Sequence, residues 1–228
     1  MKEVSMSPLE EMGAFFDARC DSYDVVHTNG IDGGPESKRI LASFLPETCK
    51  NLLDLGIGTG LELEAVFRRF PEIRVTGVDL SQKMLEKLRE KYPGRAIELH
   101  CGSYFDMEFG REAYDTAMTV MTLHHYTHEV KTALYRRIWE AIRPGGSYVE
   151  CDYMISPDTC EEPQRLEDFY FAEYKRLKRE QSLDSTQEYH FDTPCTVENQ
   201  KAMLCRAGFQ EVREVWRKKN TVVLVARR

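Results

Sequence analysis

A glycine-rich segment followed by an isolated aspartate carries the clearest chemistry in this sequence. Residues 53–60 are Leu-Asp-Leu-Gly-Ile-Gly-Thr-Gly, an apolar run that ends in a turn. Glycine permits positive φ angles and close approach of the backbone to a ligand, and a helix after the turn would offer unpaired N–H groups to an anion. Asp79 ends the next apolar run, where a carboxylate can accept hydrogen bonds from both ribose hydroxyls. Together they predict a nucleoside site, although Asp79 could also cap the following helix.

The spacing of the glycines disfavours NAD and FAD. A dinucleotide-binding turn has the pattern G-x-G-x-x-G, with glycine or alanine at the sixth position. Here that position is Leu61, and the glycines follow G-x-G-x-G. A bulky side chain at residue 61 would obstruct the close contact between helix and strand that a dinucleotide domain needs.

Polar side chains that could act on a second substrate follow two later apolar runs and precede the last predicted helix. A hydrogen-bonded structural role is the alternative for each of them. We predict His124, His125 and Asp152 as catalytic residues, and Tyr153 and His190, the latter within Glu188-Tyr189-His190-Phe191-Asp192, as substrate contacts.

No metal site is expected from the sequence. The seven cysteines are scattered without a C-x-x-C pair, which favours inert thiols over a metal site or a disulfide framework. Adjacent histidines such as His124 and His125 are expected to point apart, and no third ligand is spaced for zinc.

The composition of the chain predicts one globular domain. Its 228 residues are 42% hydrophobic and 30% charged, without an apolar run near the ~20 residues of a membrane span. The N-terminus lacks the apolar stretch of a signal peptide, so we expect a cytoplasmic protein with no membrane partner. The net charge of −7 disfavours broad nucleic-acid binding. Basic clusters at 175–179 and 217–219 leave tRNA open, and the oligomeric state is not predicted.

Strands and helices are expected to alternate through the first two thirds of the chain. Apolar runs predict strands at 51–55, 73–79, 96–101, 114–121 and 146–153, and helical spacing predicts helices at 59–70, from the N-cap Ser81 to about 93, and at 128–142. This alternation predicts a parallel sheet covered on both faces, with ligands at the carboxyl ends of the strands.

The final third of the chain departs from this alternation. A charged helix at about 157–182 is expected to cover the active site. A helix at 196–207 and two antiparallel strands at 210–216 and 220–226 follow.

Four segments in order make the sequence resemble the class I S-adenosylmethionine-dependent methyltransferase family over nearly its whole length. They are Leu53 to Gly60, Val78-Asp79-Leu80-Ser81, Tyr114 to His125, and Ile142-Arg143-Pro144-Gly145-Gly146. The resemblance implies a Rossmann-like α/β fold, with a seven-stranded, mostly parallel sheet in the order 3-2-1-4-5-7-6 and strand 7 antiparallel. It implies one domain over 1–228, with helices on both faces and a helical cover inserted at about 157–195. The implied reaction is in-line methyl transfer from S-adenosyl-L-methionine to a small molecule, leaving S-adenosyl-L-homocysteine.

The same resemblance assigns roles in cofactor binding. Asp54 is implied to help hold the cofactor's amino group, Tyr23 to lie beside its carboxylate, and Asp79 to take the ribose. The other implied cofactor contacts are Gly56, Ile57, Gly58, Thr59, Gly60, Leu80, Met84, Val120 and Met121.

One segment departs from the family pattern. Family members often have an aspartate after the third strand that accepts from the adenine amino group. Here the matching residues are Gly102, Ser103 and Tyr104, so Ser103 is the expected substitute. Adenine recognition through backbone groups is the alternative.

Two other functions stay open. The segment after the fifth strand and the C-terminal strands are similar to carboxy-S-adenosylmethionine synthase, an enzyme that serves tRNA modification. That activity needs a cation for the extra carboxylate, for which Arg176 or Arg179 is a candidate. A non-catalytic module that binds S-adenosylmethionine is the third hypothesis.

Overall fold

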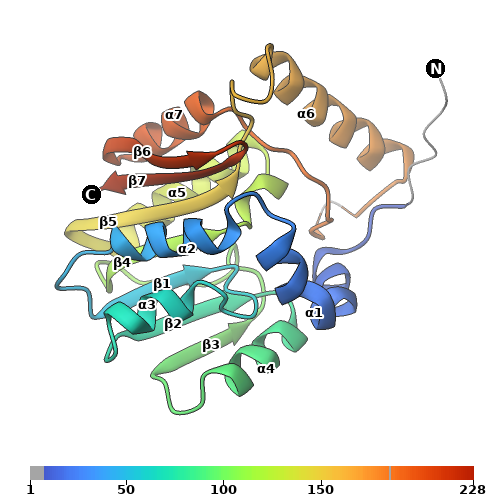
Figure 1. Ribbon diagram of the computed structural model, residues 1–228. Helices are drawn as coiled ribbons and strands as arrows, with labels where there is room; N and C mark the ends of the chain where they lie inside the picture. The colour runs from blue at the N-terminus through green and yellow to red at the C-terminus, as the bar shows by residue number, and fades with distance from the viewer. Residues whose placement is uncertain (1–7, 185) are drawn as a thin grey trace.

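The computed structural model describes residues 8–184 and 186–228. Its centre is a seven-stranded sheet in the order β3-β2-β1-β4-β5-β7-β6 (Figure 1). Strands β1 to β5 are parallel, and β7 runs antiparallel to both β5 and β6, which confirms the predicted topology. The strands are β1 Asn51–Leu55, β2 Arg74–Asp79, β3 Ile97–Cys101, β4 Tyr114–Val120, β5 Ile142–Tyr153, β6 Gln210–Lys218 and β7 Thr221–Arg227.

Helices cover both faces of the sheet, which explains why the central strands are apolar on both sides. Figure 1 shows α2, α3 and α4 on the near face, and α5 and α7 on the far face. Each layer encloses its own apolar core, which agrees with the predicted layers. The helices are α1 Met12–Asn29, α2 Gly34–Ser43, α3 Leu63–Arg69, α4 Gln82–Lys91, η1 Leu123–His125, α5 His128–Ala141, α6 Pro163–Glu180 and α7 Val197–Ala207.

Two predicted helices begin later than their sequence patterns indicate. The helix expected at 59–70 starts at Leu63, because Gly60 still has a φ of +67° and the turn continues past it. The helix expected from residue 157 starts at Pro163, a residue that fits the first turn because it needs no N–H partner. The predicted cap is confirmed, since Ser81 Oγ accepts a hydrogen bond from Met84 N at 3.1 Å.

The carboxyl ends of the strands are enclosed by α1 and by the segment that follows α6. Met12 N donates to Glu188 O at 2.8 Å, and His190 N donates to Glu10 O at 2.9 Å. The segment after α6 is thereby hydrogen-bonded to the residues that begin α1. Together these segments close one side of the space above β1, β2 and β4. Helix α6, which was expected to cover the active site, lines none of the cavities at these strand ends.

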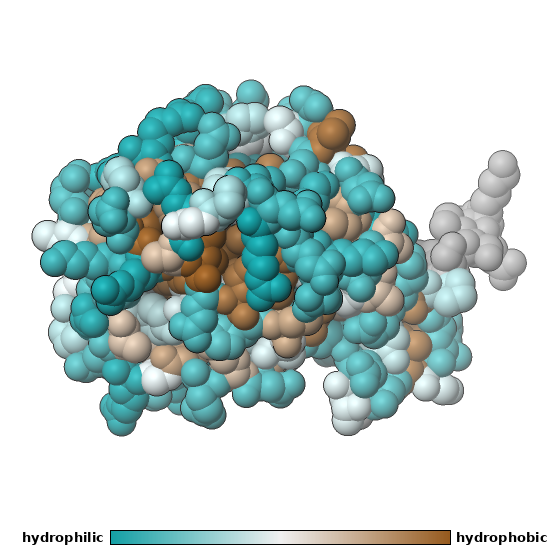
Figure 2. Space-filling view, turned by 90° about the horizontal axis from the view of Figure 1, so that it is seen from below, coloured by the Kyte–Doolittle hydropathy of each residue, from teal (hydrophilic) through white to brown (hydrophobic). Residues whose placement is uncertain are grey.

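Strand β3 forms one edge of the sheet, at the bottom of Figure 1. Seen from below, this face is mainly hydrophilic, with apolar side chains gathered in a central hollow (Figure 2). No helix within the described residues is long and apolar enough to cross a membrane.

Candidate functional site

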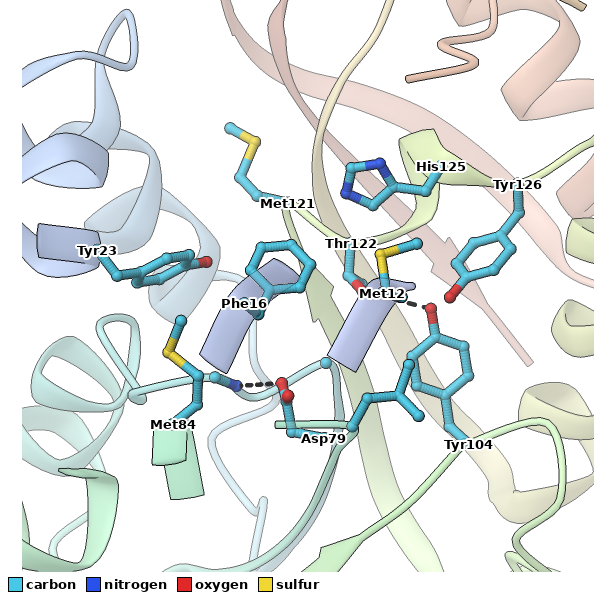
Figure 3. A pocket seen from close by; sticks show the side chains of 13 residues that line it. Met12, Phe16, Tyr23, Asp79, Met84, Tyr104, Met121, Thr122, His125 and Tyr126 are labelled. Carbon is cyan, nitrogen blue, oxygen red and sulfur yellow. Dashed lines mark hydrogen bonds between the residues drawn. The ribbon is translucent and has the colours of Figure 1, made fainter. Parts of the chain in front are cut away.

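A cavity of about 450 Å³ lies at the carboxyl ends of β1, β2 and β4. Figure 3 shows Asp79 and Met84 on one side of it, Met121 and His125 on the other, and Phe16 between them. The lining residues are Met12, Phe16, Tyr23, Gly56, Gly58, Asp79, Leu80, Met84, Tyr104, Met121, Thr122, His125 and Tyr126.

Asp79 is fixed at the floor of this cavity by two backbone hydrogen bonds. Its Oδ2 accepts from Gly58 N at 2.8 Å, and its Oδ1 accepts from Ser81 N at 2.8 Å. Burial raises the pKa of Asp79 to about 6. Since each carboxylate oxygen has two lone pairs, both oxygens keep capacity for a ligand hydroxyl.

The glycine-rich turn brings the backbone to the cavity wall, as predicted from its spacing. Gly56 has a φ of +73°, and a Cβ added there would lie 2.4 Å from the Oγ1 of Thr122. Gly58, with a φ of +51°, also lines the cavity. A Cβ added at Gly60 would contact Leu63 and Leu88. This glycine therefore allows core packing and lines none of the three cavities at the strand ends.

A smaller cavity of about 270 Å³ adjoins the turn, where Glu62 lines it and Asp54, which precedes the turn on β1, does not. Asp54 is fully buried and Glu62 is 4% exposed. Three of their carboxyl oxygens have no hydrogen-bond partner within the described part of the chain: both oxygens of Asp54 and Oε1 of Glu62. Burial raises the pKa of Asp54 well above its usual value and that of Glu62 to about 7. Such unpaired acids suit a ligand that brings an ammonium group.

One cation reaches the same smaller cavity. Lys38 of α2 is 9% exposed and donates to Gly34 O at 3.2 Å. It lines the cavity with Glu62 and Tyr23, so a ligand there would meet one lysine and one carboxyl group. This arrangement fits the two charged groups of an amino acid.

The expected adenine end is only partly as predicted. Leu80, Met84 and Tyr104 line the large cavity, but Gly102 and Ser103 do not. Ser103 Oγ instead donates to Glu188 Oε1 at 2.5 Å. The Ser103 hydroxyl, which was expected to replace the aspartate at the adenine, is therefore hydrogen-bonded to the segment that follows α6.

A second large cavity, of about 680 Å³, shares a wall with the first. The shared residues are Phe16, Tyr23, Met121 and His125. The other lining residues are Phe15, Arg19, Ser22, Val26, His27, His124, His190 and Asp192.

Met121 stands at the junction of all three cavities. It follows β4 with a φ of +51°, a left-handed conformation that is uncommon for a side chain of this size. Strain of this kind is often found at functional sites. Val120, the residue before it, lines only the smaller cavity.

The two predicted catalytic histidines lie in the wall of the second cavity. His124 Nδ1 lies 2.5 Å from Asp152 Oδ1, and Asp152 is buried behind it, where its Oδ2 accepts from Leu123 N at 2.9 Å. Burial lowers the pKa of His124, but the Asp152 carboxylate outweighs this effect, so the pKa is raised overall. Burial, followed by the neighbouring His124, lowers the pKa of His125 to about 4.

The predicted substrate contacts differ in position. His190 lines the second cavity and stacks on Phe15 with ring centroids 3.5 Å apart. Tyr153 is 38% exposed, accepts from Asn220 Nδ2 at 3.1 Å, and lines none of the three cavities. Ile57 and Thr59, predicted near the cofactor, line the smaller cavity.

Several lining residues were not predicted from the sequence. Lys38 was missed because α2 had no recognised pattern, and Glu62 because its position lay inside the helix expected at 59–70. Asp192 was recognised only as part of a polar segment. The aromatic pair Phe15 and Phe16 was the available signal for the α1 wall, and both residues line the second cavity.

Comparisons with known proteins agree with this geometry. A model of a methyltransferase domain matches residues 52–146. The carboxy-S-adenosyl-L-methionine synthase of Wolinella succinogenes is 24% identical over 200 residues, which cover 81% of this chain and 78% of that protein. The demethylmenaquinone methyltransferase of Roseiflexus castenholzii is 28% identical over 137 residues, which cover 60% of this chain and 56% of that protein.

Solved structures of other methyltransferases have a similar fold. Human N-acetylserotonin methyltransferase in complex with S-adenosylmethionine superimposes with a TM-score of 0.67 at 15% identity, covering 96% of this chain and 59% of that chain. The chain spans about half the length of several curated relatives that it matches. Its sheet order, its glycine turn with Asp79 and these matches are those of class I S-adenosylmethionine-dependent methyltransferases, and the methyltransferase domain model covers residues 52–146 of this chain.

Proposed function

We propose that this protein transfers a methyl group from S-adenosylmethionine to a hydroxyl group of a small molecule. The observation that carries this proposal is the shared wall between two cavities, one suited to a nucleoside and one lined by aromatic and imidazole side chains. Methyl transfer requires donor and acceptor to meet in line, and two adjoining cavities provide that arrangement.

The residues present fit S-adenosylmethionine along its length. Asp79 offers acceptors to the ribose, and Leu80 and Met84 offer apolar contacts to the adenine. The unpaired carboxyl groups of Asp54 and Glu62 suit the amino group, and Lys38 suits the carboxylate. When bound, this cofactor supplies an electrophilic methyl group on a positively charged sulfur.

The second cavity favours a hydroxyl acceptor over a carboxylate. A neutral hydroxyl must lose its proton, and His124 presents an imidazole held by Asp152 with Nε2 3.7 Å from Asp192. A carboxylate acceptor needs no such group and would be repelled by Asp192 in the cavity wall. Positioning alone can contribute ~7–11 kcal/mol to methyl transfer, and proton removal a further ~10²–10⁴-fold.

The aromatic walls favour a small, flat acceptor. Phe15, Phe16 and Tyr23 of α1 face the histidines across the cavity, and His190 already stacks on Phe15. A planar acceptor between such surfaces would be oriented by stacking. A macromolecular acceptor would have to displace the segment around His190 that is bonded to Glu10.

A carboxy-S-adenosylmethionine synthase-like activity is the second candidate, because the relative from Wolinella covers most of this chain. The cations predicted for the extra carboxylate are not near the cofactor. Arg176 is exposed and pairs with Glu173 and Glu180 on its own helix, and Arg179 is exposed as well. Arg19 lines the second cavity and pairs with Glu10 at 2.9 Å, and Lys38 lines the smaller cavity, so these two residues are the other candidate cations.

Calorimetric titration with S-adenosylmethionine, NAD and carboxy-S-adenosylmethionine tests the cofactor. We expect binding of S-adenosylmethionine, no binding of NAD and no preference for the carboxylated form. Incubation with methyl-labelled S-adenosylmethionine and a fractionated cell extract then tests the acceptor. Label is expected in small hydroxyl compounds, with S-adenosylhomocysteine formed in equal amount.

Three results would each contradict part of the proposal. Absence of S-adenosylmethionine binding, with no ligand retained from purification, would remove the function as a whole. Preference for the carboxylated cofactor would favour the second candidate. Tight binding without turnover in any fraction would favour a non-catalytic module.

A further inference from the structure

His124 and His125 converge on Asp192 in the wall of the second cavity. His125 Nδ1 lies 3.1 Å from Asp192 Oδ1, and His124 Nε2 lies 3.7 Å from the same oxygen. The three donor atoms all lie within 4.8 Å of one another. The expectation that adjacent histidines point apart does not hold here, because the short helix η1 turns both rings to one side, with centroids 4.0 Å apart.

His125 has a buried nitrogen without a hydrogen bond. Its side chain is 4% exposed, and its Nδ1 makes no bond of acceptable geometry to any described residue, including the nearby Asp192. A buried polar atom without a partner is unfavourable unless a ligand satisfies it. His125 lies in the cavity wall next to Asp192. A ligand bound between His125 Nδ1 and Asp192 Oδ1 would therefore satisfy this nitrogen.

The distances from Asp192 Oδ1 to the two histidine nitrogens match the needs of a metal ion. Bonds of about 2.0–2.1 Å from zinc to nitrogen or oxygen, set at a tetrahedral angle, place neighbouring donor atoms about 3.3 Å apart. The observed 3.1 and 3.7 Å lie on either side of that value. Two imidazoles with one carboxylate form a ligand set used by zinc and by iron(II) enzymes that keep an open position.

A second carboxylate supports one of these ligands from behind. Asp152 holds Nδ1 of His124 at 2.5 Å, which leaves Nε2 directed to Asp192. Outer carboxylates of this kind commonly fix the orientation of metal-binding histidines. Asp152 is itself held by Leu123 N and Tyr153 N, so the support comes from the ends of both β4 and β5.

We propose that His124, His125 and Asp192 bind one divalent transition-metal ion, with its open position toward the acceptor. This inference rests on the proposed function and changes how the acceptor is activated. The acceptor oxygen coordinates the ion, its proton is released to water, and the oxygen then forms a bond to the methyl carbon. The carbon–sulfur bond breaks with its electron pair left on sulfur, so no oxidant or reductant is needed.

A second group of side chains could also bind a metal ion. His128, Glu167 and Cys195 also lie within metal-binding distance of one another. However, Lys131 Nζ donates to Cys195 Sγ at 3.0 Å. His128 Nε2 lies 2.6 Å from Glu167 Oε1 and, like His125 Nδ1, makes no hydrogen bond of acceptable geometry to a described residue. A cation already neutralises that cluster, so we expect no ion there.

Titration of the full-length, chelator-treated protein with Zn²⁺ by calorimetry tests the site, with Co²⁺ absorption as a spectroscopic readout. One equivalent is expected to bind. Asp192→Asn and His125→Ala should remove it, Asp152→Asn should weaken it about 10–100-fold, and the exposed-histidine control His100→Ala should not change it. Circular dichroism of each variant verifies folding, and S-adenosylmethionine titration of Asp192→Asn provides an independent test of the cofactor site.

Each outcome decides the inference. Loss of the ion in Asp192→Asn with S-adenosylmethionine binding retained supports it. Absence of Zn²⁺ binding, or binding that persists in Asp192→Asn and disappears in His128→Ala, overturns it and leaves the proposed function intact. If wild-type protein binds Zn²⁺ but not S-adenosylmethionine, the metal site stands and the proposed function fails.

Discussion

The carboxylate of Asp79 accepts a hydrogen bond of 2.8 Å from the backbone N–H of Gly58, and this contact joins the ends of two neighbouring strands. The other oxygen accepts from Ser81 N, at the start of α4. The carboxylate is therefore held in one orientation before a ligand arrives. Such preorganisation reduces the entropy lost when a ribose binds.

Replacing Asp79 with alanine should weaken S-adenosylmethionine binding by about 100-fold or more. Each hydrogen bond between a hydroxyl and a charged group contributes about 1.5–3 kcal/mol, and every 1.4 kcal/mol is about tenfold in affinity. Calorimetry measures the change. Asp106→Ala, an exposed aspartate beyond β3, is the matched control and should bind normally. Equal affinities for the two variants would contradict the assignment of the ribose site.

Binding of S-adenosylmethionine should weaken as the pH falls below about 6. Burial raises the pKa of Asp79 to about 6, so protonation below this pH removes the negative charge that the ribose hydroxyls donate to. Affinity should change by up to about tenfold per pH unit below the pKa of Asp79, and Asp79→Asn separates this change from that caused by Glu62, whose pKa is about 7. Calorimetry between pH 5 and 8, over the range where the protein stays folded, measures the profile. Asp79→Asn should show a flatter profile, and an unchanged slope would assign the dependence to another group.

The fold was predictable because its signals are local. Short apolar runs alternate with amphipathic helices, and Gly56 and Asp79 fall where each run ends. The late start of α3 was not predictable from periodicity, because Leu61 and Ala65 continue the helical spacing through a turn that the positive φ of Gly60 prolongs. The α2 helix was not predicted for a different reason, because its apolar residues form no clear stripe.

The candidate site was predictable only where its residues are close in sequence. His124 and His125 follow β4, and their place near the cofactor was expected. Their convergence on Asp192 depends on a segment 67 residues after His125 that folds back over the strand ends, which no local pattern encodes. Lys38 likewise reaches the site through packing of α2 against the sheet.

Lys38→Met should distinguish binding of the amino-acid end of the cofactor from binding of its nucleoside end. Loss of the ammonium group should weaken S-adenosylmethionine by about 10–100-fold, because a charge-assisted hydrogen bond to its carboxylate is removed. 5′-Methylthioadenosine, which lacks the amino-acid carboxylate, should bind wild type and variant equally. Competition binding measures both ligands. Lys50→Met, at an exposed lysine before β1, is the control, and parallel losses for both ligands would mean that Lys38 supports the fold and not the carboxylate.

Glu62→Gln should stabilise the protein without cofactor at pH 8 and weaken its response to cofactor. Burial raises the pKa of Glu62 from 4.5 to about 7, so the folded state binds more protons than the unfolded state between these values. Stability from this group is therefore present at low pH and is lost as the pH rises through about 7. The variant should show a smaller fall in melting temperature from pH 5.5 to 8 than wild type.

Bound cofactor should restore the stability that is lost as the pH rises, because its ammonium group would compensate the buried charge of Glu62 and Asp54. S-adenosylmethionine should then raise the melting temperature of wild type more than that of Glu62→Gln at pH 8. Glu64→Gln, an exposed residue of the same helix that pairs with Arg68, is the matched control and should behave as wild type. If Glu62→Gln and Glu64→Gln have the same pH profile, the buried acids do not hold the amino group. The methionyl end of the site would then depend on Lys38 and on the backbone of the glycine-rich turn.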